Sequence, residues 1–146
     1  MSLLSSTPHR CASPEDTLRL GQRLGAGLSA GAIVLLVGPL GAGKTVLAKG
    51  IARGLGVPDE IVSPTYTIVS EYRGEKMHLY HVDLYRIEGR DQMENLGLDD
   101  LLRGDAVVIV EWGEKLDPRV VGACTRVTIA MGNDGSREVL VEETRV

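Results

Sequence analysis

Aromatic residues are nearly absent from this 146-residue sequence, which contains no phenylalanine, one tryptophan and four tyrosines. The core must therefore be built from aliphatic side chains, mainly valine, leucine, isoleucine and alanine. Long apolar runs are missing too, and none approaches the roughly 20 residues that a membrane-spanning helix needs. Residues 1–8 lack the basic and then apolar layout of a secretory signal peptide, so we expect a cytoplasmic protein.

Cysteine and clustered positive charge are also scarce. Cys11 and Cys124 are far apart and belong to no C-x-x-C pattern, which favours buried, reduced thiols. His78 and His81 have no third zinc ligand at a useful spacing, and we interpret them as strand residues without a ligand role. Sixteen lysines and arginines against twenty acidic residues give a net charge of −4, and the basic residues are scattered. Because no nucleic-acid surface is indicated, a role in an RNA pathway would depend on partner proteins.

The most informative segment is residues 38–45, which match the phosphate-binding pattern G-x-x-x-x-G-K-T of a P-loop. A strand-like apolar run precedes the segment and a helix-like stretch follows it, which is the context that the motif requires. Glycines let the backbone N–H groups surround a phosphate at the positive end of the helix. Lys44 would reach the β- and γ-phosphates, and the Thr45 hydroxyl would ligate Mg²⁺. The sequence therefore predicts a nucleoside triphosphate site.

Strand-like and helix-like segments alternate along the chain, which predicts one α/β domain over residues 1–146. Ser13 and Pro14 begin a helix expected to reach Leu28. The predicted fold is a small P-loop domain with a mostly parallel central sheet, helices on both faces and a C-terminal β-hairpin. The other expected elements are strands at 8–12, 32–37, 68–72, 77–83 and 106–111, a helix at 91–96, and hairpin strands at 126–130 and 138–141.

Acidic residues at the ends of two predicted strands are candidates for the magnesium site. Mg²⁺ takes oxygen ligands, and ligands in α/β sheets bind at the carboxyl ends of strands. Glu111 ends the strand 106–111, and Asp83 ends the strand 77–83. Glu111 is the better candidate for direct coordination because its strand is more apolar. Asp83 would then orient the attacking water or another ligand, although the sequence alone leaves the choice of direct ligand open.

Two further features stand near the predicted site. The loop 63–67 lies between the P-loop helix and the next strand, where a threonine such as Thr65 could sense the γ-phosphate through magnesium. Trp112 directly follows Glu111 and is a candidate nucleotide contact, although a lone tryptophan is more often a packing residue. No N-K-x-D or T-K-x-D pattern follows a strand, so adenine is the expected base. No arginine-rich lid or acceptor pocket is visible, which suggests slow hydrolysis and a partner that completes the site.

Four motifs occur together in one order along the chain, at residues 41–45, 63–67, 81–86 and 110–112. In combination they resemble the TsaE (YjeE) family, the ATPases of bacterial tRNA threonylcarbamoyladenosine biosynthesis. The resemblance extends from the helix after Ser13 to the final hairpin. It implies an ATP- and Mg²⁺-binding protein that hydrolyses ATP slowly and acts with TsaB-like and TsaD-like partners. Those partners transfer the threonylcarbamoyl group to adenosine 37 of tRNAs that read ANN codons.

The resemblance also implies roles for individual residues. Thr45 and Glu111 would be the magnesium ligands, and Asp83 and Lys44 would support hydrolysis. Pro39 stands where the family usually has an acidic residue, which removes a carboxylate there but leaves phosphate binding by the backbone intact. Thr17, at the start of the first helix, would also touch nucleotide. The nucleotide-binding residues would be Gly41, Ala42, Gly43, Lys44, Thr45, Val46, Thr65, Trp112 and Arg137.

Two other classes of function stay open at this point. A small-molecule phosphotransferase would need an acceptor pocket and a base beside the γ-phosphate. A nucleotide-gated binding module would bind ATP tightly with negligible turnover. Phosphate transfer to an acceptor would distinguish the first, and binding without hydrolysis in the presence of partners would distinguish the second.

Overall fold

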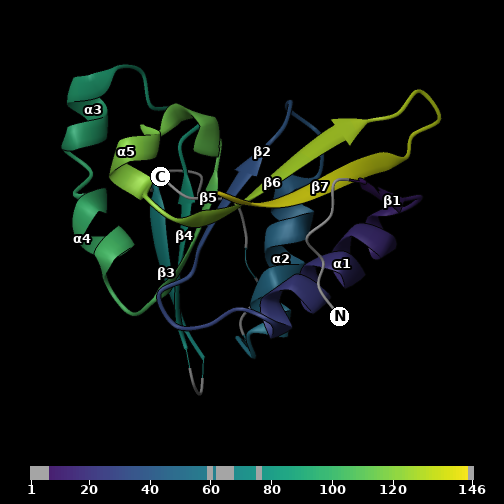
Figure 1. Cartoon of the computed structure of the whole chain (residues 1–146), viewed down its shortest axis with the longest axis horizontal. Coiled ribbons are helices and arrows are strands. Elements are labelled where there is room, and N and C mark those ends of the chain that lie inside the picture. Colours follow the sequence, from purple (N-terminus) through teal and green to yellow (C-terminus); the bar gives the residue numbers. More distant parts are fainter. Residues whose placement is uncertain (1–6, 59–60, 62–67, 75–76, 145–146) are drawn as a thin grey trace.

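The computed structural model describes residues 7–58, 61, 68–74 and 77–144. These residues form a seven-stranded sheet in the order β1-β7-β6-β2-β5-β4-β3 (Figure 1). The strands are β1 (His9–Cys11), β2 (Ile33–Val37), β3 (Val69–Arg73), β4 (His78–Asp83), β5 (Val107–Glu111), β6 (Cys124–Met131) and β7 (Arg137–Thr144). The helices are α1 (Pro14–Ala26), α2 (Lys44–Gly54), α3 (Arg90–Glu94), α4 (Leu98–Arg103), the 3₁₀ turn η1 (Gly113–Lys115) and α5 (Pro118–Val121).

The middle of the sheet is parallel and its edges are antiparallel. β2 pairs in parallel with β5 and β6, and β4 pairs in parallel with β5. β1–β7, β6–β7 and β3–β4 are antiparallel pairs. The predicted parallel centre and closing hairpin are therefore confirmed. The antiparallel pairing of β1 with β7 adds an edge that the sequence did not predict, because it joins segments from opposite ends of the described chain.

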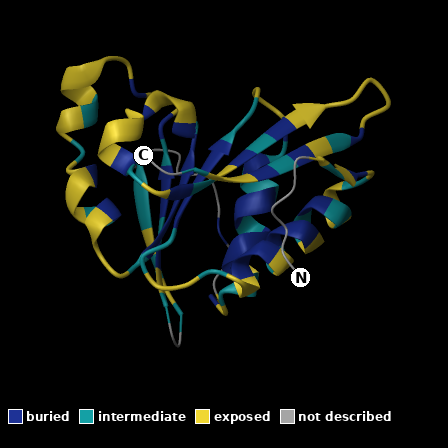
Figure 2. Ribbon diagram, in the orientation of Figure 1, coloured by how far each residue is buried: buried dark blue, intermediate teal, exposed yellow. Residues whose placement is uncertain are grey.

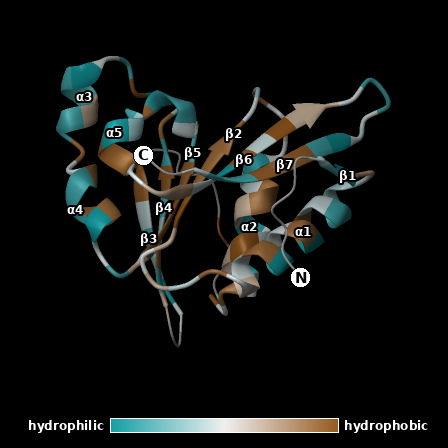
Figure 3. Ribbon diagram, in the orientation of Figure 1, coloured by the Kyte–Doolittle hydropathy of each residue, from teal (hydrophilic) through white to brown (hydrophobic). Residues whose placement is uncertain are grey.

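Helices cover both faces of the sheet, as predicted (Figure 1). Val34 and Leu36 of β2 lie in the core beneath α1 and α2, while Ile33 and Leu35 lie in the core beside α4 and α5. Strands β2 and β5 are apolar on both sides because each face is buried, and Figure 3 colours them mostly brown. Figure 2 shows the same strands in dark blue, with exposed residues on the outer sides of the helices.

Glycines allow α1 and α2 to pack closely on each other. A Cβ at Gly25 of α1 would lie 2.1 Å from the carbonyl oxygen of Ile51, and one at Gly50 of α2 would lie 2.3 Å from the carbonyl oxygen of Leu18. No side chain fits in such a space, so the two backbones touch directly. This contact holds α2, and with it the loop at its N-terminus, against the rest of the domain.

The helix boundaries differ from those expected at several points. Helix α1 starts at Pro14 with Ser13 as its N-cap, as predicted, but it ends at Ala26 because Gly27 caps it. Gly97, with a φ of 67°, separates α3 from α4, whereas only one helix, at 91–96, was expected in this region. Helices α4 and α5 were missed because they span six and four residues, too few for a helical period to show. In the part of the chain described, no helix combines the length and apolarity needed to cross a membrane.

Candidate functional site

The loop that carries the P-loop sequence pattern connects β2 to α2 at the carboxyl edge of the sheet. Gly41 and Gly43 have φ values of 82° and 101°, and a Cβ at either position would point into open space. Backbone conformation, and not crowding, therefore requires glycine at these two positions. Ala42 between them is fully buried and anchors the loop. The result is the tight turn before a helix N-terminus that residues 38–45 predicted.

Lys44 lies inside the curve of this loop. Its Nζ donates to the carbonyl oxygens of Gly38 at 2.5 Å and Pro39 at 2.9 Å. Burial lowers the pKa of the Lys44 ammonium, while nearby carboxylates, led by Glu111, oppose that change. The loop thus encloses a positive charge whose partners are neutral carbonyls. Pro39 contributes its carbonyl here, so the missing acidic side chain does not interrupt this contact.

Thr45 and Glu111 meet at the first turn of α2. The Thr45 hydroxyl donates to Glu111, with distances of 3.0 and 3.1 Å to the two carboxylate oxygens. Glu111 is only 3% exposed, at the end of β5. A hydroxyl and a carboxylate are hard oxygen ligands of the kind that Mg²⁺ prefers, so these residues fit that ion. Among the residues described, no cluster of three or more His, Cys, Asp or Glu could hold a metal, so phosphates and water would supply the other ligands.

His81 is the residue of this site that the sequence analysis missed. It is fully buried on β4, and its Nε2 lies 2.6 Å from Oε2 of Glu111. A sequence signal existed, because alternation along a strand puts His81 on the same face as Asp83. The expectation that His81 is a strand residue without a ligand role concerned metal binding, and it left a hydrogen bond to a buried carboxylate unconsidered.

Asp83 lies beside Glu111, and the two residues are register partners of the parallel pair β4–β5. Both acids thus lie at the carboxyl edge of the sheet, where ligands of α/β proteins generally bind. Asp83 is half-buried, and its Oδ1 accepts a hydrogen bond from the backbone N–H of Tyr85 at 3.0 Å. The contact with Thr45 belongs to Glu111, which makes Glu111 the better placed of the two for a magnesium ion held by that hydroxyl.

Trp112 has a left-handed backbone, with φ 61° and ψ 41°. It is the one non-glycine residue with a positive φ among those described. A left-handed conformation costs an L-residue about 1–2 kcal/mol, so the surrounding contacts must hold it. The Nζ of Lys44 lies 3.9 Å from the ring centroid of Trp112, and the ring of Tyr85 packs at a centroid distance of 5.2 Å. The ring therefore covers the lysine of the P-loop.

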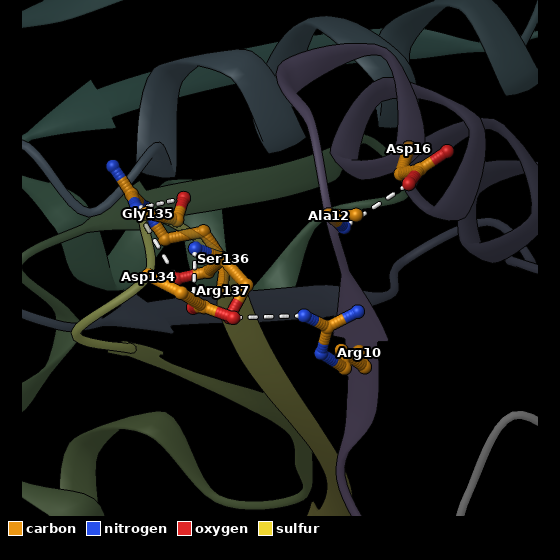
Figure 4. Close-up of polar contacts among 7 residues, drawn as sticks. All are labelled: Arg10, Ala12, Asp16, Asp134, Gly135, Ser136 and Arg137. Atoms are coloured by element: carbon orange, nitrogen blue, oxygen red, sulfur yellow. Dashed lines mark hydrogen bonds and ion pairs between the residues drawn. The ribbon is translucent and has the colours of Figure 1, made fainter.

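Arg137 joins the C-terminal hairpin to the P-loop. Its Nε donates to the carbonyl oxygen of Ala42 at 3.0 Å, and its Nη2 donates to that of Gly41 at 3.2 Å. Nη1 donates to the carbonyl oxygen of Gly135 within the hairpin turn at 2.8 Å, as Figure 4 shows. The guanidinium thus holds the backbone of the phosphate loop, a role that the sequence analysis did not foresee.

The hairpin turn that carries Arg137 is itself held in place. Asp134 accepts hydrogen bonds from the backbone N–H and the hydroxyl of Ser136 and forms an ion pair with Arg10 of β1 at 2.9 Å (Figure 4). These donors, led by the Ser136 hydroxyl, lower the pKa of Asp134 to about 2. The contacts with Ser136 hold the turn itself, and the ion pair with Arg10 connects it to β1.

The remaining predicted residues lie in different surroundings. Val46 is half-buried in the first turn of α2. Thr17 is 2% exposed, and its hydroxyl lies 3.4 Å from the carbonyl oxygen of Ser13. Thr65 and its loop 63–67 lie outside the described residues. A cavity of about 1070 Å³ lies against α3, α4 and α5, and none of residues 38–45 lines it.

Comparison with known proteins gives consistent matches. A family model described as "Threonylcarbamoyl adenosine biosynthesis protein TsaE" matches residues 11–139. A TsaE protein of Treponema pallidum is 37% identical over 134 residues, which cover 90% of this chain and 98% of that protein. A TsaE protein of Mycobacterium bovis is 48% identical over 115 residues, covering 73% of this chain and 68% of that protein. The crystal structure of YdiB from Bacillus subtilis matches with a TM-score of 0.77 and 30% identity, covering 99% of this chain and 90% of that one.

Proposed function

The chain belongs to the TsaE family of tRNA threonylcarbamoyladenosine biosynthesis, and on this premise we propose that it is a magnesium-dependent ATPase that serves as an accessory factor in that modification. It binds ATP, hydrolyses it slowly, and acts with TsaB-like and TsaD-like proteins that modify adenosine 37. The observation that carries the proposal is the meeting of Lys44, Thr45 and Glu111 at the N-terminus of α2. tRNA would be reached only through the partners, since the basic residues are scattered.

Phosphate binding would use the loop and Lys44. The N–H groups at the start of α2 and the positive end of its helix dipole attract an anion. Lys44 contacts only carbonyl oxygens and the Trp112 ring among its described neighbours, so phosphate oxygens would be stronger acceptors for its ammonium. Arg137 holds the carbonyls of Gly41 and Ala42 on the loop, which keeps the loop in its turned conformation before ATP arrives.

Thr45 and Glu111 would hold the magnesium ion, which would neutralise charge on the β- and γ-phosphates. Glu111 is preferred to Asp83 as the direct ligand because it already contacts the Thr45 hydroxyl. Asp83, beside it at the strand end, would accept a hydrogen bond from the attacking water and orient it.

The charged groups around Lys44 support the proposal of slow ATP hydrolysis by the isolated chain. Positioned positive charge supplies several orders of magnitude in phosphoryl transfer. The arginine found at the loop, Arg137, donates its described hydrogen bonds to backbone carbonyls. A partner that adds charge or orders the site would therefore accelerate hydrolysis.

The proposal is tested with Lys44→Ala and the control Lys49→Ala, further along the same helix. ATP affinity is measured by isothermal titration calorimetry, with and without Mg²⁺. Lys44→Ala should abolish binding or weaken it strongly because it removes the charge that faces the phosphates, and Lys49→Ala should bind like the parent. Unchanged ATP affinity in Lys44→Ala would refute the proposed nucleotide site.

A second assay separates the accessory factor from the other functions. Threonylcarbamoylation of tRNA is followed with TsaB-like and TsaD-like proteins, with and without this chain, while phosphate release is measured. The proposal expects ATP hydrolysis to rise with the partners and modification to require the chain. Transfer of the γ-phosphate to a small acceptor would identify a phosphotransferase instead, and tight binding with no hydrolysis would identify a binding module.

A further inference from the structure

We propose that His81 is a positioning residue for the magnesium site, because its imidazole fixes the carboxylate of Glu111 in the orientation that coordination requires. The inference rests on the proposed function, since it concerns magnesium-dependent ATP binding at the same site. His81 itself would touch neither the ion nor the nucleotide.

The sheet places His81 beneath the P-loop helix. Successive residues of a strand point to opposite faces, so Leu79, His81 and Asp83 share one face of β4. Leu79 lies in the core beneath α1 and α2, which identifies that face as the one covered by α2. His81 pairs with Ile109 of β5 in the register, and Glu111 follows two residues later on the same face. The imidazole therefore reaches the carboxylate diagonally across the two strands.

The contact itself is short and shielded from water. Nε2 of His81 lies 2.6 Å from Oε2 of Glu111, and the two side chains are 0% and 4% exposed. An ionised carboxylate only accepts hydrogen bonds, so Nε2 carries the proton and donates it. Nδ1 is buried without a partner within the described part of the chain, which would leave a second ring proton unpaired. The His81–Glu111 contact therefore uses Nε2, and Nδ1 takes no part in it.

This hydrogen bond determines which carboxylate oxygen of Glu111 is left to bind the magnesium ion. Oε2 is occupied by His81, and the Thr45 hydroxyl lies at similar distances from both oxygens. The Thr45 contact alone therefore leaves the carboxylate free to rotate, whereas the His81 bond fixes its plane. With Oε2 held, Oε1 remains for the ion. Partners that orient metal ligands in this way typically contribute about 10- to 100-fold to metal affinity.

The test compares His81→Leu, which fills similar space without a donor, with His81→Gln, whose amide nitrogen can replace Nε2. Binding of a non-hydrolysable ATP analogue is titrated with EDTA and then across Mg²⁺ concentrations, with Trp112 fluorescence and calorimetry as readouts. We expect His81→Leu to lower magnesium affinity about 10- to 100-fold, with binding in EDTA unchanged. His81→Gln should retain most of the magnesium affinity. A merely structural role would not produce this difference between the two variants.

Further variants make the outcomes distinguishable. In a Glu111→Ala background, His81→Leu should cause no additional loss, because His81 acts through that carboxylate. If His81→Leu does not fold, His81→Asn, whose shorter amide cannot reach Oε2, takes its place. Magnesium affinity equal to that of the parent in the donor-lacking variant, while Glu111→Ala still weakens it, would overturn the role of His81 alone. A parent protein without magnesium-dependent binding would overturn the proposed function and this inference with it.

Discussion

Replacing Gly25 by alanine should destabilise the protein, although the same change stabilises most helices. Alanine is favoured over glycine inside a helix by about 1 kcal/mol. At Gly25 the new methyl group would lie 2.1 Å from the carbonyl oxygen of Ile51 and 2.9 Å from its carbon. The obstacle is backbone, which cannot rotate aside as a side chain does, so α1 and α2 must separate.

The magnitude follows from these opposing effects. Overpacking of a close contact costs about 1–3 kcal/mol and occasionally more. We expect a clash with backbone to cost an amount at the upper end of this range. After the helix preference for alanine is subtracted, the free energy of unfolding should fall by about 2 kcal/mol. For a domain of this size, about 2 kcal/mol corresponds to a fall in Tm of roughly 5–10 °C.

Gly27→Ala is the matched control. Gly27 caps the same helix with a φ of −95°, and its Cβ would meet nothing nearer than the Leu24 carbonyl oxygen at 3.7 Å. Thermal and urea unfolding followed by circular dichroism should show Gly25→Ala well below the parent, with Gly27→Ala close to it. A Gly25→Ala variant as stable as the parent would show that α1 and α2 do not touch through their backbones.

Two further predictions concern the proposed nucleotide site. Arg137→Leu should weaken ATP binding about tenfold, with and without magnesium, because the hydrogen bonds that hold the P-loop are lost. Calorimetry checks this, and unchanged affinity would contradict the role given to Arg137. Asp83→Asn should keep ATP affinity but lose the proposed stimulation of hydrolysis by TsaB-like and TsaD-like proteins, because it removes the group proposed to orient water. Phosphate release equal to that of the parent with those proteins present would show that Asp83 has no such role.

Much of the fold could be predicted from patterns of neighbouring residues in the sequence. Ser13 and Pro14 specify the start of α1 because capping depends on neighbouring residues only. The apolar runs at 32–37 and 106–111 predicted strands because a short continuous apolar run is typical of a strand buried on both faces, and they form β2 and β5. The antiparallel edges were less accessible, since the pairing of β1 with β7 depends on segments at opposite ends of the chain.

Part of the candidate site could likewise be predicted from the sequence, and part could not. Glu111 and Asp83 were predicted to lie together because ligands in α/β sheets bind at the carboxyl ends of strands, and the register pairs them there. The contact of His81 with Glu111 and the close packing at Gly25 were not predicted, because both depend on which element covers the residue. An interior histidine resembles any other strand residue until a carboxylate 30 residues away is placed beside it.

The contact between Arg137 and the P-loop also bears on synthesis of the protein. Arg137 is separated by 95 residues from Ala42, whose carbonyl it holds. At about 5–20 residues per second, a ribosome would need roughly 5–20 s to extend the chain from the loop to that arginine. β1 likewise cannot form its strand pairing until β7 has been synthesised, because its described strand partner is β7. The nascent chain therefore lacks the hydrogen bonds from Arg137 to residues 41 and 42 until its last described strand has been synthesised.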